Sequence, residues 1–247
     1  MEVPHDLQAE PPGRMSLPAR LLGVITNPAA VYDDVAAAPR TPSNWIAPWM
    51  LLVIATAVLT QLLIQNAEFA AQLMSVMHEQ VDLLVNDGAV PREDADRQLA
   101  LLQPGMPLFT VLSIAGPALW GLGMVFALSL LYWLIGRSAM HAFAPYMKVV
   151  EVVGLASLIS VIELCVSTGL ILATGTLTIT PTAAALFPSV AEDSLLYALL
   201  LKANPFSVWL VIVTSVGLAR LFARDVPKVI VLILSLWILW TVAMLIT

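Results

Sequence analysis

The 247-residue sequence contains few charged side chains, one cysteine and three histidines. Only 11% of the residues are charged, 60% are hydrophobic and the mean hydropathy is +0.90, which excludes a soluble protein whose core is covered by a polar shell. The 11 Lys and Arg residues form no basic cluster and the net charge is −6, so nucleic-acid binding is not expected. This composition therefore predicts an integral membrane protein, and the lipid bilayer is its first expected partner.

Motifs for metals, cofactors and catalysis are also missing. Cys165 has no second cysteine with which to form an intramolecular disulfide, and neither CxxC nor HExxH occurs. His78 and Asp82 lie one helical turn apart, but two ligands without a third favour a solvated helix face. No GxGxxG, P-loop or GxSxG motif occurs, and His5, His78 and His141 fall in predicted tails or loops, where they build no triad. We therefore expect no catalytic residue, no cofactor, no metal and no enzymatic activity.

Long apolar stretches dominate what is present. A hydrocarbon layer about 30 Å thick needs roughly 20 apolar residues of helix, because every backbone amide in lipid must be paired within its own segment. Trp45 and Trp49 open the first stretch, as is typical of the lipid–water boundary, and Asn204 with Pro205 predicts a capped start for the fourth. The predicted fold class is an all-α integral membrane bundle of five transmembrane helices, at about 45–65, 108–135, 149–174, 205–222 and 228–246.

The distribution of basic residues predicts the orientation, since Lys and Arg are retained on the cytoplasmic side. Eight basic residues fall in the N-terminal tail, the loop between spans two and three, and the turn between spans four and five. The opposite side holds only three, together with seven acidic residues in its first loop. The N-terminus is therefore expected in the cytoplasm and the C-terminus outside it.

The first 40 residues divide into two predicted parts. Residues 1–16 contain adjacent prolines, scattered charges and no apolar signal-peptide core, and are expected to form a disordered cytoplasmic tail. From Leu17 onward, apolar residues recur at helical spacing, and Asn27-Pro28 predicts a second helix start. Either a short helix on the cytoplasmic leaflet or an ordinary linker would fit this segment.

The longest polar segment, residues 66–107, predicts a helical hairpin outside the cytoplasm. Apolar residues from Phe69 to Leu84 share one helical face, so the first span is expected to continue beyond the membrane. Asn86-Asp87-Gly88 ends this helix, and the acid-rich turn after Pro91 begins a second helix that reaches about Leu102. In the second outer loop, residues 175–204, Ser189 and Glu192 have the spacing of a capping box, ahead of an apolar helix at 195–201 that is too short to cross.

Glu163 is the one ionisable residue predicted deep within a span, where a charge costs at least about 2.5–3.5 kcal/mol. Ser160 and Ser167 lie three residues before it and four after it, so the three share a helix face. One interpretation is a proton-responsive group in a permeation pathway. The favoured one is a neutral carboxylic acid that holds helices together. The expected hydrogen-bond partners on neighbouring spans are Thr60, Gln61 or Thr214.

Two further patterns concern packing. Glu151 lies near the predicted cytoplasmic edge with Lys148 three residues earlier, which predicts an interfacial ion pair. Small residues let helices approach closely in lipid, and they predict tight packing of spans two, three and four. These small residues are Ser113, Gly116, Gly121, Gly123, Ala127, Gly154, Ser157, Ser215 and Gly217.

The fourth span carries a family resemblance. Its sequence, NPFSVWLVIVTSVGLARLF, resembles the Phe-Ser-x-Trp opening and the Gly-Leu-Ala ending of bacterial members of the Yip (Ypt/Rab-interacting protein) domain family. The matching positions are Asn204, Pro205, Phe206, Trp209 and Gly217. The segments from Leu22 to Pro28 and from Tyr146 to Leu158 are similar to other parts of the same family, so that the resemblance covers about residues 17–245.

This resemblance implies a polytopic protein of five helices with a cytoplasmic N-terminus, which agrees with the charge distribution. Eukaryotic members are linked to Rab GTPases, but this chain lacks their Asp-Leu-Tyr-Gly-Pro motif, so Rab binding is not carried over. The short tail and the Ala- and Leu-rich composition suggest a bacterial inner (plasma) membrane.

Two functional hypotheses follow from the sequence. The first is a non-enzymatic membrane protein of the Yip class that acts by helix–helix interaction, with itself or with other membrane proteins, as an organiser or an assembly or trafficking factor. The alternative is a small-solute or proton-responsive transporter or channel that uses Glu163 with Ser160 and Ser167.

Overall fold

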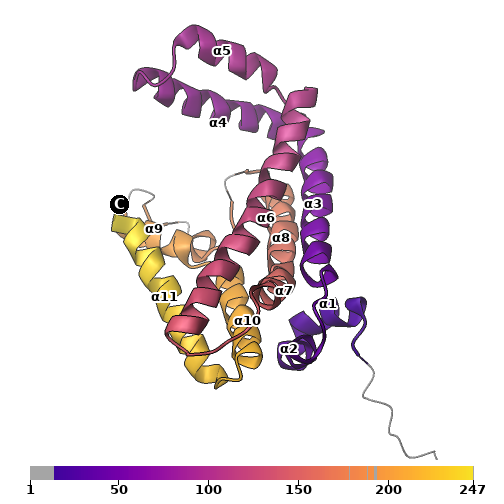
Figure 1. Ribbon diagram of the computed structural model, residues 1–247. Coiled ribbons are helices and arrows are strands. Elements are labelled where there is room, and N and C mark those ends of the chain that lie inside the picture. Colours follow the sequence, from indigo (N-terminus) through magenta and orange to yellow (C-terminus); the bar gives the residue numbers. More distant parts are fainter. Residues whose placement is uncertain (1–13, 178, 188, 192–193, 247) are drawn as a thin grey trace, which may run out of the picture.

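A computed structural model describes residues 14–177, 179–187, 189–191 and 194–246 of the chain, and the described part consists of helices and the loops between them, with no strand (Figure 1). This confirms the predicted all-α membrane bundle. The helices are α1 (Leu17–Thr26), α2 (Pro28–Ala37), α3 (Ser43–Ile64), α4 (Ala67–Asn86), α5 (Arg92–Leu101), α6 (Pro107–Ser138), α7 (Tyr146–Ala156), α8 (Leu158–Thr174), the short 3₁₀ helix η2 (Ala183–Leu186), α9 (Leu195–Lys202), α10 (Pro205–Leu221) and α11 (Val226–Ile246).

Four of the described segments are long and apolar enough to cross a membrane: α3, α6, the α7–α8 pair and α11. Helix α10 has 17 residues, about 25 Å of helix, and passes the same test only together with α9, to which it joins at a bend of 46°. The five predicted spans thus correspond to α3, α6, α7–α8, α10 and α11. The fourth differs from the prediction because it is one arm of a bent pair rather than a straight span.

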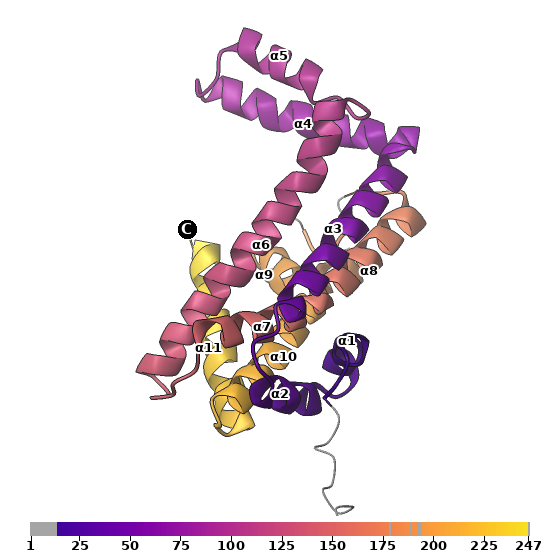
Figure 2. The same ribbon diagram turned by 45° about the vertical axis from the view of Figure 1, so that its right-hand side comes forward.

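The segment from Ala67 to Leu101 forms the predicted helical hairpin, which lies across one end of the bundle in Figures 1 and 2. The expected continuation of the first span is wrong, since α3 ends at Ile64 and α4 restarts after Asn66, whose side chain accepts a hydrogen bond from the Glu68 amide. Asp82 of α4 pairs with Arg92 of α5 and closes the hairpin.

Helix α7 lies at the centre of the bundle, where every residue from Lys148 to Ala156 is buried. It packs against α2, α3, α6 and α10. The approach to α3 is close at Gly154, where an added Cβ would lie 2.6 Å from Trp45 Cα. At Gly217 of α10, an added Cβ would lie 2.5 Å from Val152 Cγ1. Small residues on spans three and four therefore do mediate close packing.

The expected packing of spans two, three and four on one another is only partly correct. Helices α6 and α10 each pack on α7, while α6 also packs on α3 and α10 also packs on α2 and α11. A Cβ added at Gly116 or Gly123 of α6 would meet no atom within 4 Å in the described part of the chain. Glycine permits a close approach there, but no helix makes one.

The N-terminal segment is helical, and its second helix belongs to the bundle. Asn27 caps α2 by accepting a hydrogen bond from the Ala30 amide, and Pro28 follows as predicted. Val31, Tyr32 and Val35 of α2 are buried where it packs on α10 and α7. The segment is therefore neither a linker nor solely a surface helix. The predicted disordered tail falls largely on residues 1–13, which lie outside the described residues.

The short helix of the second outer loop begins later than its predicted capping box. Ser194 is the N-cap of α9 and accepts a hydrogen bond from the Tyr197 amide at 3.1 Å. Ser189 therefore does not cap this helix, and Glu192 lies outside the described residues.

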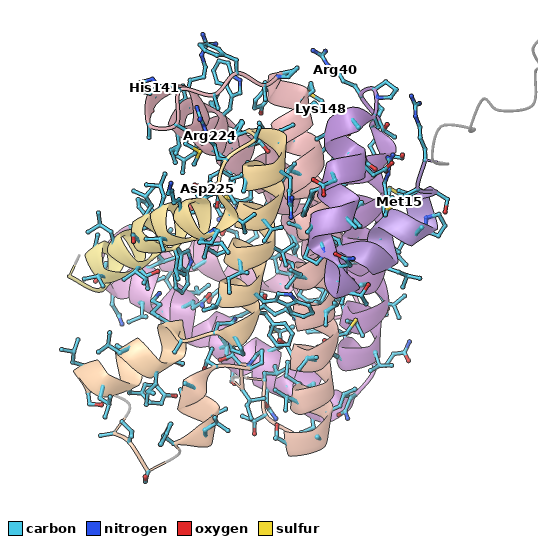
Figure 3. The ribbon with its side chains drawn as sticks, turned by 90° about the horizontal axis from the view of Figure 1, so that it is seen from below. Met15, Arg40, His141, Lys148, Arg224 and Asp225 are labelled. Carbon is cyan, nitrogen blue, oxygen red and sulfur yellow. The ribbon has the colours of Figure 1, made fainter. Side chains whose placement is uncertain are left out.

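Three segments that the charge distribution assigned to one side of the membrane do share one end of the bundle. In Figure 3, Arg40, Lys148 and Arg224 come into view together at the end opposite the α4–α5 hairpin. Arg224 Nη2 donates to the Met140 carbonyl at 2.5 Å and so ties the α10–α11 turn to the α6–α7 loop. In the same turn, a hydrogen bond from Lys228 holds the pKa of the Asp225 carboxyl below its usual value.

Candidate functional site

Glu163 contacts the beginning of a neighbouring helix. Its Oε1 accepts a hydrogen bond from Asn204 Nδ2 at 2.5 Å, while Asn204 Oδ1 accepts one from the Phe206 amide at 2.9 Å. Asn204 is thus the predicted N-cap of α10 and also the partner of Glu163. The N-terminal end of a helix favours an acidic group, which gives Glu163 a structural reason for its position. The expected partners Thr60, Gln61 and Thr214 were wrong.

The other two residues of the predicted polar face are not brought together with Glu163 around one site. Ser160 lines a cavity between the spans, whereas Glu163 and Ser167 are not among the described residues that line it. Both are half-buried on α8. The shared face did not produce a shared site, because its surroundings change along the helix. Ser160 borders the cavity, whereas Glu163, one turn further on, contacts the start of α10.

A larger polar cluster lies at the opposite end of the same span, where sequence reasoning expected only an interfacial ion pair. Lys148 and Glu151 do pair, with 3.2 Å between Nζ and Oε2, but their residues are only 6% and 1% exposed. Lys148 Nζ also donates to the carbonyls of Val35 at 2.8 Å and Pro39 at 3.1 Å, at the end of α2. The two predicted partners therefore do pair, but the pair is buried within the bundle rather than at the membrane interface.

Helices α1, α2 and α3 supply the remaining members of this cluster. Glu151 accepts hydrogen bonds from the Thr41 amide at 3.0 Å and from Asn44 Nδ2 at 2.8 Å. Asn44 Oδ1 in turn accepts from Arg20 Nη1 at 3.1 Å, and Arg20 Nε donates to Asp34 at 2.8 Å. We call the connected set of Arg20, Asp34, Asn44, Lys148 and Glu151 the charged network.

The charged network is electrically balanced, with two cations and two carboxylates. Burying a charge is unfavourable unless it is paired and hydrogen-bonded, and here each charged group meets both conditions. The hydrogen bond between Asn44 and Glu151 joins residues more than 100 positions apart in the sequence. The network therefore fixes the N-terminal helices to α7, and its groups are already engaged with one another rather than free for chemistry.

The motif residues of the fourth span have defined places on α10. Pro205 occupies the first helical position after the Asn204 cap, and the ring centroids of Phe206 and Trp209 lie 6.4 Å apart. Gly217 faces Val152 of α7 and the ring of Tyr32 on α2. The first four of these positions begin α10, and Gly217 lets it pack closely against α7 and α2.

The fold defines a multi-pass α-helical membrane protein. A family model described as the Yip1 domain matches residues 22–247, nearly the whole chain, and the chain therefore belongs to the Yip1 domain family. This confirms the resemblance found in α10 and in the segments from Leu22 to Pro28 and from Tyr146 to Leu158. No curated protein and no solved structure shows significant similarity to the chain.

Proposed function

We propose that this Yip1-family protein is non-enzymatic and acts by helix–helix contact, with other membrane proteins or with a second copy of itself, as an organiser or an assembly or trafficking factor. The observation that carries the proposal is the set of apolar side chains left uncovered on the α4–α5 hairpin. Val76, Leu83 and Leu84 of α4 and Leu101 of α5 are all exposed.

Exposed leucines on the hairpin and on the spans have different surroundings. On α6 or α11 an exposed leucine faces lipid, which is its favourable solvent. The hairpin lies beyond the ends of α3 and α6 and carries the acidic residues Glu79, Asp82 and Asp87 on α4 and at its end. Uncovered apolar surface next to such charges is typical of a surface that binds another protein.

The charged network supports the same proposal because it makes the opposite end of the molecule rigid. With α1 and α2 fixed to α7, a partner that binds the hairpin would meet a bundle of fixed shape. We further propose that the basic end faces the cytoplasm of a bacterial inner membrane and that the hairpin lies outside, since basic residues are retained on the cytoplasmic side.

Photocrosslinking in native membranes tests the proposed contact. A photoreactive amino acid at Leu84 or Leu101 is expected to give one reproducible protein adduct, identified by mass spectrometry as a second copy or as a particular membrane protein. The same amino acid at His78, an exposed polar position that helical periodicity places on another face of α4 than Val76, Leu83 and Leu84, is the matched control and should give no such adduct. Leu83→Ser should weaken the adduct. Adducts to lipid alone, from a protein that is strictly monomeric in mild detergent, would contradict the proposal.

The transport alternative is less well supported by the geometry. A permeation pathway through the cavity would need Glu163 to face it, but the carboxyl is hydrogen-bonded to Asn204 instead. A flux through liposomes that Glu163→Gln alters would nevertheless overturn the interaction role in favour of transport.

A further inference from the structure

A cavity of about 530 Å³ lies among α3, α6, the α7–α8 pair, α10 and α11. Its volume falls within the range of small-molecule sites. The cavity lies between α6, which packs on α3 and α7, and the pair formed by α10 and α11. Trp49 Nε1 donates to the Ala118 carbonyl at 2.9 Å and holds α3 against α6 along one wall.

Hydroxyl groups without protein partners line this cavity. Thr214 of α10 is 3% exposed, yet its hydroxyl forms no hydrogen bond with any described residue. The hydroxyls of Tyr132, Ser160 and Ser207 also line the cavity and are equally unpartnered within the described part of the chain. By contrast, the adjacent Ser215 donates to the Val211 carbonyl at 2.6 Å. Thr214 is buried and the other three residues are half-buried. Because polar groups withdrawn from water are normally hydrogen-bonded, these hydroxyls around one cavity indicate a ligand with hydrogen-bonding atoms.

The remaining lining defines the chemistry of that ligand. No Asp, Glu, Lys or Arg is among the described residues that line the cavity, so a charged headgroup would find no counter-charge there. Most of the wall is apolar, and four tryptophans contribute to it: Trp49, Trp120, Trp237 and Trp240. The cavity thus fits a hydrocarbon chain that carries an uncharged carbonyl or hydroxyl group.

The cavity also reaches the lipid-facing surface of the bundle. Trp120 of α6 and Trp240 of α11 both line it and are 72% and 63% exposed. A molecule dissolved in the bilayer could therefore enter sideways between these two helices. We propose that the cavity binds a neutral ester lipid of the diacylglycerol type, with an acyl chain against the tryptophans and its ester or hydroxyl oxygens hydrogen-bonded to Thr214 and the neighbouring hydroxyls.

Photolabelling of the full-length protein in liposomes tests this inference. The probe is a diacylglycerol with a diazirine in one acyl chain, and its adducts are expected on cavity peptides of α6, α10 and α11. Unlabelled diacylglycerol should compete for these adducts, whereas unlabelled phosphatidylglycerol should not. Loss of one hydrogen bond by Thr214→Val should reduce the labelling about fivefold. Ser160→Leu, which fills part of the cavity, should reduce it further.

Thr168→Val is the matched control, because Thr168 is also 3% exposed but its hydroxyl donates to the Leu164 carbonyl at 2.9 Å. This variant should label like the unmodified protein. Thermal unfolding in detergent establishes that each variant is folded. Equal competition by diacylglycerol and phosphatidylglycerol, or labelling that a folded Thr214→Val variant leaves unchanged, would overturn the inference. These outcomes are independent of the crosslinks expected at the hairpin.

Discussion

Replacing Glu151 by leucine is expected to lower the free energy of unfolding by about 3–5 kcal/mol, the range found when one partner of a buried ion pair is removed. The Lys148 ammonium would remain buried without its carboxylate. The Thr41 amide and the Asn44 side chain would lose their acceptors at the same time. One substitution on α7 would thus loosen the attachment of α1, α2 and the start of α3.

Denaturation of the purified protein in mixed detergent micelles measures this loss. Arg97→Ala is the control, since Arg97 forms exposed ion pairs with Glu93 and Asp94 on α5, and such pairs contribute little. The double variant Lys148→Met with Glu151→Leu removes both charges and should be less destabilised than the sum of the two single variants. If Glu151→Leu and Arg97→Ala shift the transition equally, the charged network does not hold the bundle together.

Replacing Gly154 by alanine is expected to destabilise the protein by about 1–3 kcal/mol, as overpacking of a close contact generally does. The new Cβ would lie 2.6 Å from Trp45 Cα and 3.3 Å from the Asn44 carbonyl oxygen, and these backbone atoms cannot move aside as a flexible side chain could. Helix α3 would be displaced from α7 next to the charged network.

Gly123→Ala is the matched control for this prediction. Gly123 is also a glycine within a spanning helix, but a Cβ there would meet no described atom within 4 Å. Alanine has the higher helix propensity, so this variant should be neutral or slightly more stable. The same denaturation experiment compares the two. Equal stability of both variants would mean that α3 and α7 do not approach as closely as the structure has them.

Local signals in the sequence were sufficient to predict most of the helices, though not the breaks at Asn66 and Ser157. The Asn204-Pro205 and Asn27-Pro28 pairs mark helix starts through capping and the fixed φ of proline, and Asn86-Asp87-Gly88 marks a helix end. Each signal acts within a few residues of itself, so its meaning does not depend on the rest of the fold. The length of the apolar stretches likewise identified the spans, because bilayer thickness sets that length.

Pairings between distant helices could not be predicted in the same way. Arg20 and Asp34 look like surface charges of an amphipathic segment, and nothing local relates them to Glu151 of the third span. Gly123 and Gly154 both permit a close approach, but only Gly154 meets another helix. The spacing of residues shows which of them share a face of a helix, but not which other helix packs on that face. For the same reason, Asn204 was missed as the partner of Glu163.

We propose that the α4–α5 hairpin and the basic end of the bundle lie on opposite sides of the membrane. Labelling of single cysteines in intact cells with a membrane-impermeant thiol reagent tests it, in a background where Cys165 is replaced by serine. A cysteine at Asp87, between α4 and α5, should react from outside. One at His141, in the α6–α7 loop, should react only after the membrane is permeabilised. Reaction of both positions from the same side would contradict the account.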